Sequence, residues 1–380
     1  MYKIKTLNKI SKVGLDRFGG NYSCGDDIEN PDAIMLRSFN MHDMEIPATV
    51  RAIARAGAGV NNIPIDKCTE KGIAVFNTPG ANANAVKELV IAALLISSRK
   101  IFEGAKWAST LTEDVSKAVE KGKSQFVGPE IMGKKLGVIG LGAIGVMVCN
   151  AAHSLGMDVI GYDPYISVDA AWGLSRAIHK AASVKEIFEQ CDYITIHVPL
   201  NDETKDTISA ESISMMKDGV RILNFARGGL VNSKAIIEAV ESGKVAKYIT
   251  DFPDADMINK ENIIAIPHLG ASTPESEDNC AVMAANELID YLENGNVVNS
   301  VNFPKCTMER STNVRICIFH KNIPNMIGQI SKYFAEKNVN IENMINKGRG
   351  DYAYTMVDVD HEPSEKDIIF DGIIWVRIIN

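Results

Sequence analysis

Short apolar runs alternate with stretches of helical periodicity between residues 135 and 268. The runs read LGVIG, DVIGY, YITIHV, VRILNF, KYITDF and IIAIPH, and between them lie stretches such as AIGVMVCNAAHSL and SKAIIEAVESG. Apolar runs of this length bounded by turn residues indicate buried strands, and apolar positions recurring every three or four residues indicate helices. This alternation predicts a parallel sheet with helices on both faces.

Residues 1 to 96 show the same alternation of strand and helix patterns in a smaller segment. Strands are expected at 33–36 and 73–76, followed by a long helix from about 84 to 99. A further amphipathic helix is expected at 276–294, ending at Gly295 before the extended segment NGNVVNSVNFPK. The fold class is therefore α/β, with two Rossmann-like parallel-sheet lobes.

The last seventy residues follow a different pattern. NVRICIFH alternates as a strand does, and a helix follows whose apolar stripe is Met326, Ile327, Ile330 and Phe334. A hairpin around Gly348 and Gly350 and a closing strand, IIWVRII, complete a β-α-β-β order. Residues 311–380 are thus expected to form a small α+β domain.

Composition and charge narrow the class of protein. The chain has 380 residues, a net charge of −8 and no apolar run long enough to span a bilayer, so we expect neither membrane nor nucleic-acid binding. The start, MYKIKTLNKISK, lacks the apolar core of a signal peptide. Seven cysteines without a C-x-x-C pair predict a cytoplasmic protein with no metal site.

A glycine fingerprint follows the strand LGVIG. Gly140, Gly142 and Gly145 have the G-x-G-x-x-G spacing between a strand and a helix, which is the setting that dinucleotide binding requires. Asp163 ends the second strand, where a carboxylate can accept hydrogen bonds from a ribose 2′-hydroxyl and would repel a 2′-phosphate. The predicted cofactor is NAD rather than NADP.

Polar side chains stand at the ends of three later strands. Arg227 lies in NFARGG, Asp251, Asp254 and Asp256 lie in TDFPDAD, and His268 lies in IPHLGAST. Oxidation of a 2-hydroxy acid needs a base for the hydroxyl proton, and imidazole suits this step. A carboxylate would orient that imidazole, and a guanidinium would bind the substrate carboxylate.

Seven motifs together resemble the D-isomer-specific 2-hydroxyacid dehydrogenase family, and most closely its members that oxidise 3-phospho-D-glycerate in L-serine biosynthesis. They are RAGAGVNNI, FNTPGANANAV, VIGLGAIG, HVPL, NFARGGLV, PHLGASTPESE and VNFP. The resemblance implies a substrate-binding lobe formed by 1–96 and 276–303 and an NAD-binding Rossmann domain at 97–275. Two alternatives stay open: a glyoxylate or hydroxypyruvate reductase of the same family, and a non-catalytic, NAD-sensing corepressor.

The resemblance also assigns site residues. It implies a catalytic trio of Arg227, an acid and His268. Counting forward from the arginine places the acid at Asp256, with Asp254 as the alternative because the segment departs from the family pattern. Cofactor contacts beyond the fingerprint glycines would come from Thr78, Ala143, Ile144, Asp163, Val198, Pro199, Ala226 and Asp251. Substrate contacts would come from Arg37, Ser38, Arg55, Gly57, Gly59 and Val60.

The C-terminal domain resembles an ACT domain, a regulatory module that binds amino acids at paired interfaces. This resemblance implies an L-serine effector, bound by His320, Asn322 and Asn340, and a homo-oligomer, either a dimer or a tetramer. Asn325 stands where the family commonly has glycine. The alternative is a module that only assembles subunits.

Overall fold

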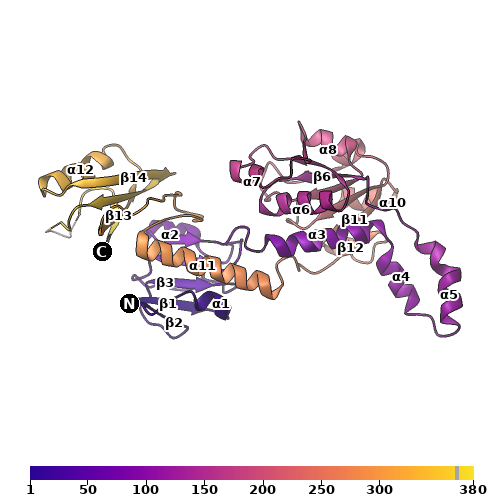
Figure 1. Ribbon diagram of the computed structural model, residues 1–380, viewed down its shortest axis with the longest axis horizontal. Helices are drawn as coiled ribbons and strands as arrows, with labels where there is room; N and C mark the ends of the chain where they lie inside the picture. The colour runs from indigo at the N-terminus through magenta and orange to yellow at the C-terminus, as the bar shows by residue number, and fades with distance from the viewer. Residues whose placement is uncertain (364–367) are drawn as a thin grey trace. The chain divides into compact units, whose positions relative to one another are not determined.

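The computed structural model describes residues 1–363 and 368–380. The chain forms two compact units, the first from 1–82 and 274–380 and the second from 83–273 (Figure 1). The α/β fold class and the small α+β module at the C-terminus are confirmed. The first unit contains that module as well as the N-terminal lobe.

The N-terminal lobe is built on a five-stranded parallel sheet of order β2-β1-β3-β4-β5. Its strands are β1 (Tyr2–Leu7), β2 (Tyr22–Gly25), β3 (Ala33–Leu36), β4 (Ala52–Arg55) and β5 (Ala74–Phe76). Helices α1 (Lys12–Leu15), α2 (Ile65–Glu70) and α11 (Pro274–Asn294) belong to the same unit. A Cβ added at Gly14 would lie 2.4 Å from the Ala281 Cβ, so only glycine lets α1 approach α11 this closely.

The C-terminal module is a four-stranded antiparallel sheet of order β14-β15-β13-β16. Its elements are β13 (Val314–Lys321), α12 (Met326–Glu336), β14 (Ile341–Arg349), β15 (Tyr352–Val359) and β16 (Ile373–Ile379). One face of the sheet packs Ile316, Ile318, Val357 and Val359 against Ile330 and Phe334 of α12. Ile327 of the predicted stripe is instead 38% exposed, so the apolar stripe of α12 is narrower than the sequence suggested.

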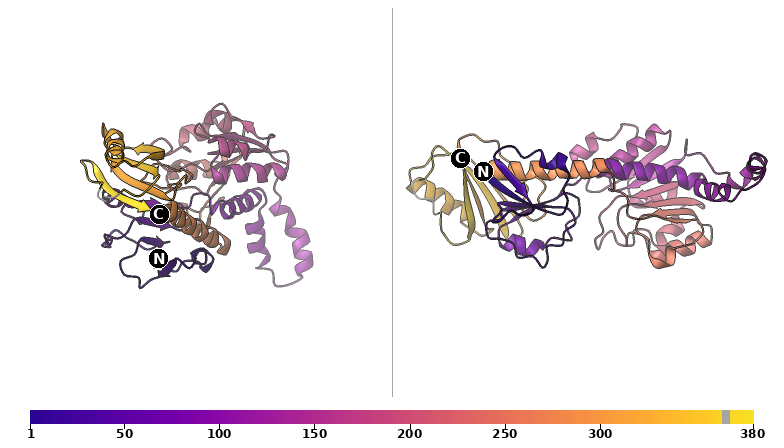
Figure 2. Two further views of the ribbon diagram at one scale, coloured as in Figure 1. Left: turned by 60° about the vertical axis from the view of Figure 1, so that its left-hand side comes forward. Right: turned by 90° about the horizontal axis from the view of Figure 1, so that it is seen from below.

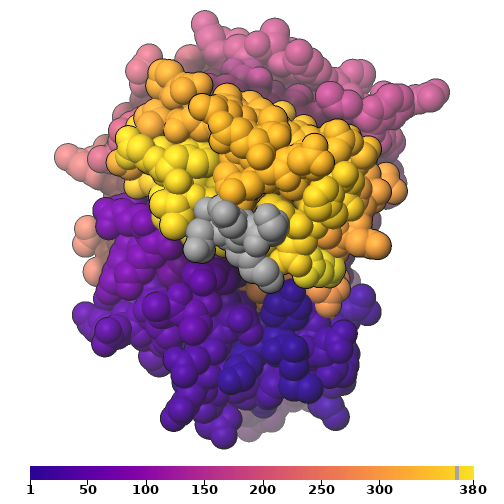
Figure 3. Space-filling model, turned by 90° about the vertical axis from the view of Figure 1, so that its left-hand side faces the viewer, coloured from indigo at the N-terminus to yellow at the C-terminus, as the bar shows by residue number. Residues whose placement is uncertain are grey.

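The opposite face of this sheet joins the core of the N-terminal lobe. Phe319 stacks on Phe303 with ring centroids 4.1 Å apart, and the Trp375 indole donates to the Gly72 carbonyl at 2.6 Å. Because strand side chains alternate between faces, the module buries apolar residues on both sides. Figure 3 shows the module, orange to yellow, lying directly against the N-terminal residues in indigo and purple.

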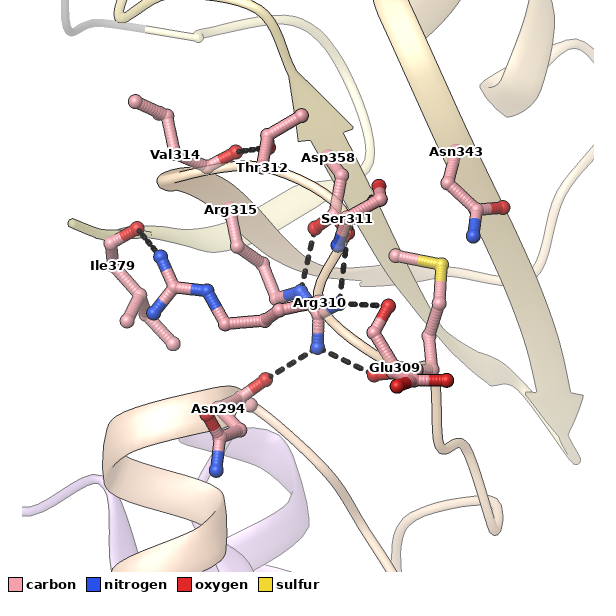
Figure 4. A network of polar contacts seen from close by, with 12 residues as sticks. Asn294, Glu309, Arg310, Ser311, Thr312, Val314, Arg315, Asn343, Asp358 and Ile379 are labelled. Atoms are coloured by element: carbon pink, nitrogen blue, oxygen red, sulfur yellow. Dashed lines mark hydrogen bonds and ion pairs between the residues drawn. The ribbon is translucent and has the colours of Figure 1, made fainter.

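A buried ion pair fastens the module to the end of α11. The Arg315 Nε donates to Asp358 at 2.6 Å, and both side chains are fully buried. The same guanidinium donates to the carbonyls of Asn294 and Met308, each at 2.8 Å, and of Glu309 at 3.0 Å (Figure 4). Burial disfavours the charged form of Asp358, but hydrogen bonds from Arg315 and Ser311 outweigh it and lower the pKa of this carboxyl.

The second unit is built on a seven-stranded parallel sheet of order β12-β11-β10-β9-β6-β7-β8. Its strands are β6 (Lys135–Ile139), β7 (Asp158–Tyr162), β8 (His179–Lys180), β9 (Tyr193–Ile196), β10 (Val220–Asn224), β11 (Val245–Thr250) and β12 (Ile263–Ala265). Its helices are α3 (Ala83–Ser98), α6 (Ala143–Ser154), α7 (Val168–Trp172), α8 (Val184–Gln190), α9 (Ala210–Met215) and α10 (Ser233–Glu241), with a 3-10 turn η2 (Ala255–Met257). The strand order reverses at β6, and ligands of such sheets bind at that point.

Helix α3 belongs to this unit, because Val86, Val90 and Leu94 pack into its core. The units therefore divide at 82/83 and 273/274, whereas the sequence placed the borders at 96 and 275. After α3, helices α4 (Ile101–Ala108) and α5 (Val115–Gly122) and the turn η1 (Lys123–Phe126) form an arm. The two views of Figure 2 both show this arm, in purple, projecting from its unit.

Candidate active site

The glycine turn after β6 has the tight geometry that its sequence predicts. Gly140 has φ +93°, and a Cβ there would lie 2.6 Å from the His197 carbonyl oxygen. A Cβ at Gly145 would lie 1.9 Å from the Gly140 carbonyl oxygen, whereas at Gly142 it would meet nothing within 4 Å. The first and third glycines are thus required by packing, and the second leaves open space beside the backbone for a pyrophosphate.

The amino end of α6 and Asp163 complete a dinucleotide cradle. Gly142 caps α6, and Ala143 and Ile144 form its first turn, which places backbone N–H groups at the open turn. Asp163 follows β7, and its two oxygens accept the N–H groups of Leu141 and Tyr165, each at 2.8 Å. These bonds hold the carboxylate beside the glycine turn, where it suits a ribose hydroxyl.

Loops after β9 and β10 flank this cradle. Val198 lies against the turn, since its Cγ1 would be 2.8 Å from a Cβ at Gly140, and Pro199 follows it. Burial lowers the pKa of the neighbouring His197 to about 4, so its ring is neutral at physiological pH. Ala226 is held by Asn224, whose side chain accepts the Ala226 N–H at 3.1 Å.

Asn224 is a positioning residue that the sequence motifs did not indicate. Its Nδ2 also donates to the Arg227 carbonyl at 2.9 Å, so one buried amide fixes the turn that carries the arginine. Arg227 itself is exposed, and its Nη1 donates to the Ala226 carbonyl at 2.7 Å. An amide side chain at the end of an otherwise apolar strand was the signal that could have identified it.

Asp251 is a buried carboxylate at the end of β11. It is 2% exposed, and within the described residues no side chain donates a hydrogen bond to either carboxylate oxygen. Burial raises its pKa, whereas the charge of His268, the backbone N–H groups of Asp251 and Gly270, and the charge of Arg227 act in the opposite direction. A buried carboxylate with so few donors is costly, so this position suits a ligand donor such as a carboxamide N–H.

His268 lies after β12 with its ring exposed and packed on Phe252. The two ring centroids are 4.5 Å apart and the planes are inclined by 50°. The strand register pairs Asn224 with Thr250 and Thr250 with Ala265, so the ends of β10, β11 and β12 lie side by side. The structure therefore gathers Arg227, Asp251 and His268 at one edge of the sheet.

The two candidate acids lie on the short η2 turn. Asp254 Oδ1 accepts the N–H groups of Asp256 at 3.1 Å and Met257 at 3.2 Å, so this side chain caps the turn. Asp256 is exposed. Neither acid forms a hydrogen bond to His268 in the described part of the chain, and the pairing of either with the histidine stays a prediction.

The loop after β4 gathers the predicted substrate residues of the first unit. Arg55 Nε donates to the Arg37 carbonyl at 2.9 Å, and its Nη1 donates to the Gly59 carbonyl at 2.5 Å. Gly57 has φ +153°, and a Cβ there would lie 2.7 Å from the Arg55 Nη1. The Arg55 guanidinium thus shapes its own loop, up to Val60.

Arg37, Ser38 and Thr78 border this loop. Arg37 and Ser38 follow β3, and the Arg37 guanidinium pairs with Glu277 at 2.7 Å. Thr78 is fully buried and its N–H donates to the Gly57 carbonyl at 3.1 Å. Among the described residues, its hydroxyl has no hydrogen-bond partner. These residues lie together beside the loop, and their roles toward substrate and cofactor stay predictions.

The predicted effector residues fall at both ends of the C-terminal sheet. His320 is 2% exposed, with Nδ1 bonded to the Lys321 carbonyl and Nε2 to the Thr355 hydroxyl, at 2.7 and 2.9 Å. Asn322 is exposed at the same end, and Asn340 precedes β14 at the opposite end. Asn325 has φ +68°, so it adopts the left-handed conformation that the family glycine would favour.

Within the described ranges, no helix is long and apolar enough to cross a membrane. No cluster of three or more His, Cys, Asp or Glu side chains suited to a metal ion occurs there either.

A glycine turn at the point where strand order reverses, with a ribose-binding carboxylate, defines a dinucleotide-binding α/β protein. The sequence pattern of the D-isomer specific 2-hydroxyacid dehydrogenase NAD binding domain matches residues 91–270. The chain is 31% identical to a D-3-phosphoglycerate dehydrogenase of Haemophilus influenzae over 84% of its own length and 79% of that protein. It belongs to the D-isomer-specific 2-hydroxyacid dehydrogenase family.

Longer relatives match as well. A D-3-phosphoglycerate dehydrogenase of Methanocaldococcus jannaschii is 32% identical over 91% of this chain, which spans 65% of that relative. A Bacillus subtilis protein of the same name is 32% identical over 76% of the chain, which spans 55% of it. The chain thus spans about half to two thirds of the length of several curated relatives.

Among solved structures, NAD⁺-bound 3-phosphoglycerate dehydrogenase of Entamoeba histolytica is similar, with a TM-score of 0.60 and 26% identity. The match covers 79% of this chain and 98% of that one. D-2-hydroxyisocaproate dehydrogenase has a TM-score of 0.66 at 20% identity, covering 79% of this chain and 99% of that one. The latter likeness shows the fold alone.

Proposed function

We propose that the protein is an NAD-dependent dehydrogenase that oxidises 3-phospho-D-glycerate to 3-phosphohydroxypyruvate, the first step of L-serine biosynthesis. The observation that carries this proposal is the gathering of Arg227, Asp251 and His268 at one sheet edge beside a dinucleotide cradle. Relatives named D-3-phosphoglycerate dehydrogenase cover 84% and 91% of the chain at 31% and 32% identity, and they support the choice of substrate.

The predicted catalytic trio consists of Arg227, an acid and His268, and each member has a defined task in this reaction. His268 accepts the proton of the substrate hydroxyl, and the Arg227 guanidinium pairs with the substrate carboxylate. A carboxylate orients His268, and the family pattern assigns that role to Asp256 or Asp254. NAD held by the glycine turn and Asp163 would supply the acceptor for the hydride that leaves C2 of the substrate.

The substrate is a small polyanion, and the first unit offers groups that suit it. Backbone N–H groups of Gly59 and Val60, together with Arg37 and Ser38, would bind its carboxylate and phosphate, while the Gly57 N–H donates to the Arg55 carbonyl at 2.9 Å. Arg55 contributes by holding the loop through Gly59 and Arg37. Open backbone geometry at glycines is typical of anion-binding loops.

Initial rates of NAD reduction with 3-phosphoglycerate, glycerate and D-lactate test the proposal. We expect turnover with 3-phosphoglycerate and a kcat/KM at least about 100-fold lower without the phosphate. A preference for glycerate, or for glyoxylate in the reverse direction, would instead identify a reductase of the same family. Absence of turnover with every hydroxy acid, with NAD binding retained, would favour the corepressor.

We further propose that L-serine binds between two copies of the C-terminal module. Asn322 and Asn340 lie at opposite ends of one sheet, so one copy cannot bring them together. Strand β14 is an edge strand with mostly exposed side chains. Antiparallel pairing of this edge with its twofold mate would bring Asn340 of one copy to the Asn322 end of the other. His320 would support this site from within the sheet.

The effector proposal is tested by adding L-serine to the assay. Inhibition should be lost in Asn322→Ala and Asn340→Ala and retained in Lys332→Ala, an exposed change on α12. Inhibition unaltered by either asparagine change would place the serine elsewhere, and no inhibition in the parent protein would leave a module that only assembles subunits.

A homo-oligomer is also favoured by the arm of the second unit. Ile101, Phe102, Val115 and Val119 are between 37% and 52% exposed on α4 and α5, and clustered apolar surface of this kind commonly pairs with a second copy. Light scattering should give a dimer or tetramer, and a monomer would contradict this part of the proposal.

The seven free thiols suit a cytoplasmic location.

A further inference from the structure

An ion pair joins the central strand of the N-terminal lobe to the start of its long helix. The Arg37 Nη2 lies 2.7 Å from the Glu277 Oε1, and the two side chains are 44% and 43% exposed. Arg37 directly follows β3, the middle strand of the five, and Glu277 stands in the first turn of α11. Both residues belong to the first unit.

The backbone on both sides of this ion pair is held in place. The Arg37 carbonyl accepts a hydrogen bond from Arg55 Nε at 2.9 Å. Helix α11 packs on β3 and β4, and Asp278, which follows Glu277, accepts a hydrogen bond from the Ser11 hydroxyl. The fold therefore presents the Glu277 carboxylate at the end of β3, beside the predicted substrate loop.

Stability gives little reason for this ion pair. A pair of side chains this exposed contributes little to folding, because water screens both charges. A carboxylate in the first turn of a helix is favourable by itself, but Glu275 already supplies one there. What Glu277 adds is a negative charge in contact with the Arg37 guanidinium.

Glu277 and the substrate phosphate would compete for that guanidinium. Both are anions that bind arginine, and a phosphate that approaches the carboxylate is repelled by it. The proposed function gives the substrate carboxylate to Arg227, and Arg55 donates to two carbonyls near its own loop. Arg37 is therefore the arginine best suited to the phosphate, which has to displace Glu277 or tolerate its charge.

We propose that Glu277 is a specificity-determining residue that competes with the substrate phosphate for Arg37. It weakens the binding of a phosphorylated hydroxy acid and leaves that of an unphosphorylated one nearly unchanged, so it narrows the preference between the two. This inference rests on the proposed function for the identity of the substrate. The competition itself is an equilibrium property, which a binding measurement reports without turnover.

Steady-state kinetics of Glu277→Gln with 3-phosphoglycerate and with glycerate test the inference. The KM for 3-phosphoglycerate should fall about 3- to 10-fold, because the competing charge is removed. The kcat for 3-phosphoglycerate and the kcat/KM for glycerate should stay within about twofold of the parent values, since glycerate carries no phosphate to be repelled. An unchanged or higher KM for 3-phosphoglycerate would overturn the inference.

A matched control separates this effect from a general change in charge. Glu275→Gln removes a carboxylate from the same helical turn, so it alters the helix terminus equally. It should leave the KM for 3-phosphoglycerate within about 1.5-fold, because solvent and salt screen a charge that does not touch Arg37. A fall in KM as large as that of Glu277→Gln would contradict the competition.

A double-mutant cycle assigns the effect to Arg37. In the Arg37→Ala background, Glu277→Gln should change the KM for 3-phosphoglycerate by less than about twofold, because the contested cation is absent. Equal gains with and without Arg37 would show that Glu277 acts on the substrate through its charge alone, and would overturn the inference.

Equilibrium binding separates this inference from the proposed function. Calorimetric titration with 3-phosphoglycerate in the presence of NADH, which cannot accept a hydride, gives a Kd without turnover. This Kd should fall about 3- to 10-fold in Glu277→Gln. If the parent protein binds 3-phosphoglycerate but does not oxidise it, the proposed function fails and the Kd still decides the inference. If the parent protein does not bind it, both fail.

Discussion

The Glu287 carboxyl accepts a hydrogen bond from Asn299 Nδ2 at 2.6 Å inside the N-terminal lobe. Burial raises the pKa of Glu287 to about 7, and the Asn299 hydrogen bond opposes that shift. The next links lead to the substrate loop: Asn77 donates its N–H to the Asn299 carbonyl at 3.3 Å and its Nδ2 to the Ala58 carbonyl at 2.6 Å. A titratable group is thus connected to this loop.

We therefore expect the protein to lose stability as the pH rises from about 4.5 to 7. The native state keeps the Glu287 proton over this range and the unfolded chain releases it, so the contribution of this group falls with rising pH. The loss is at most about 3 kcal/mol. Urea unfolding at several pH values gives the free energy of unfolding as a function of pH. This free energy should fall less steeply with rising pH in Glu287→Gln than in the parent protein. An unchanged slope there, or an equal change in the exposed control Glu275→Gln, would contradict the assignment.

The fingerprint glycines should respond differently to alanine. Gly142→Ala has room for its methyl group, so we expect normal stability with NAD affinity lowered about tenfold or more. Gly145→Ala forces a Cβ to within 1.9 Å of the Gly140 carbonyl oxygen and should cost about 1–3 kcal/mol of unfolding free energy. Thermal unfolding measures the stability of the two variants, and titration with NAD followed by fluorescence measures their NAD affinity. Equal stability in the two variants would show that the turn geometry is wrong.

Asp163→Ala should relax the preference for NAD over NADP, because the carboxylate that repels a 2′-phosphate is lost. The variant also frees the N–H groups of Leu141 and Tyr165, so NAD affinity should fall as well. The measurement is the ratio of kcat/KM values for the two cofactors. An unaltered ratio would mean that Asp163 shapes the turn without reading the ribose.

Breaking the Arg315–Asp358 pair should destabilise the first unit strongly. Arg315→Met leaves Asp358 buried without its cation, which costs about 3–5 kcal/mol. The double change Arg315→Met with Asp358→Leu should recover much of the loss, since no buried charge remains. Urea unfolding of the three proteins tests this, and a double variant as unstable as the single one would contradict it.

The repeating pattern of the chain predicted most of the second unit. The strands β6, β7, β9, β10, β11 and β12 match the six apolar runs, because all except the edge strand β12 are largely buried and therefore mostly apolar. The arm of α4 and α5 was not predicted, because its two helices have only eight residues each and their apolar side chains remain exposed instead of joining a core. Helix α3 was predicted, but only packing showed which unit it joins.

The candidate site also contains some features that the sequence predicts and others that it does not. Gly140, Gly145 and Asp163 could be predicted because a turn and a carboxylate have local sequence signatures. The acid that pairs with His268 could not be chosen between Asp254 and Asp256, because counting residues from Arg227 assumes a loop of constant length. The hydrogen bonds of Arg55 within its own loop likewise depend on tertiary geometry.

The central claim is that His268 and Arg227 perform 3-phosphoglycerate oxidation on NAD. The most direct measurement is kcat/KM with 3-phosphoglycerate for the parent protein, His268→Ala and Arg227→Ala, alongside NAD affinity. We predict a loss of about 1,000-fold or more in each variant with NAD affinity within about threefold of the parent protein. Turnover within tenfold of the parent protein in both variants would contradict the account.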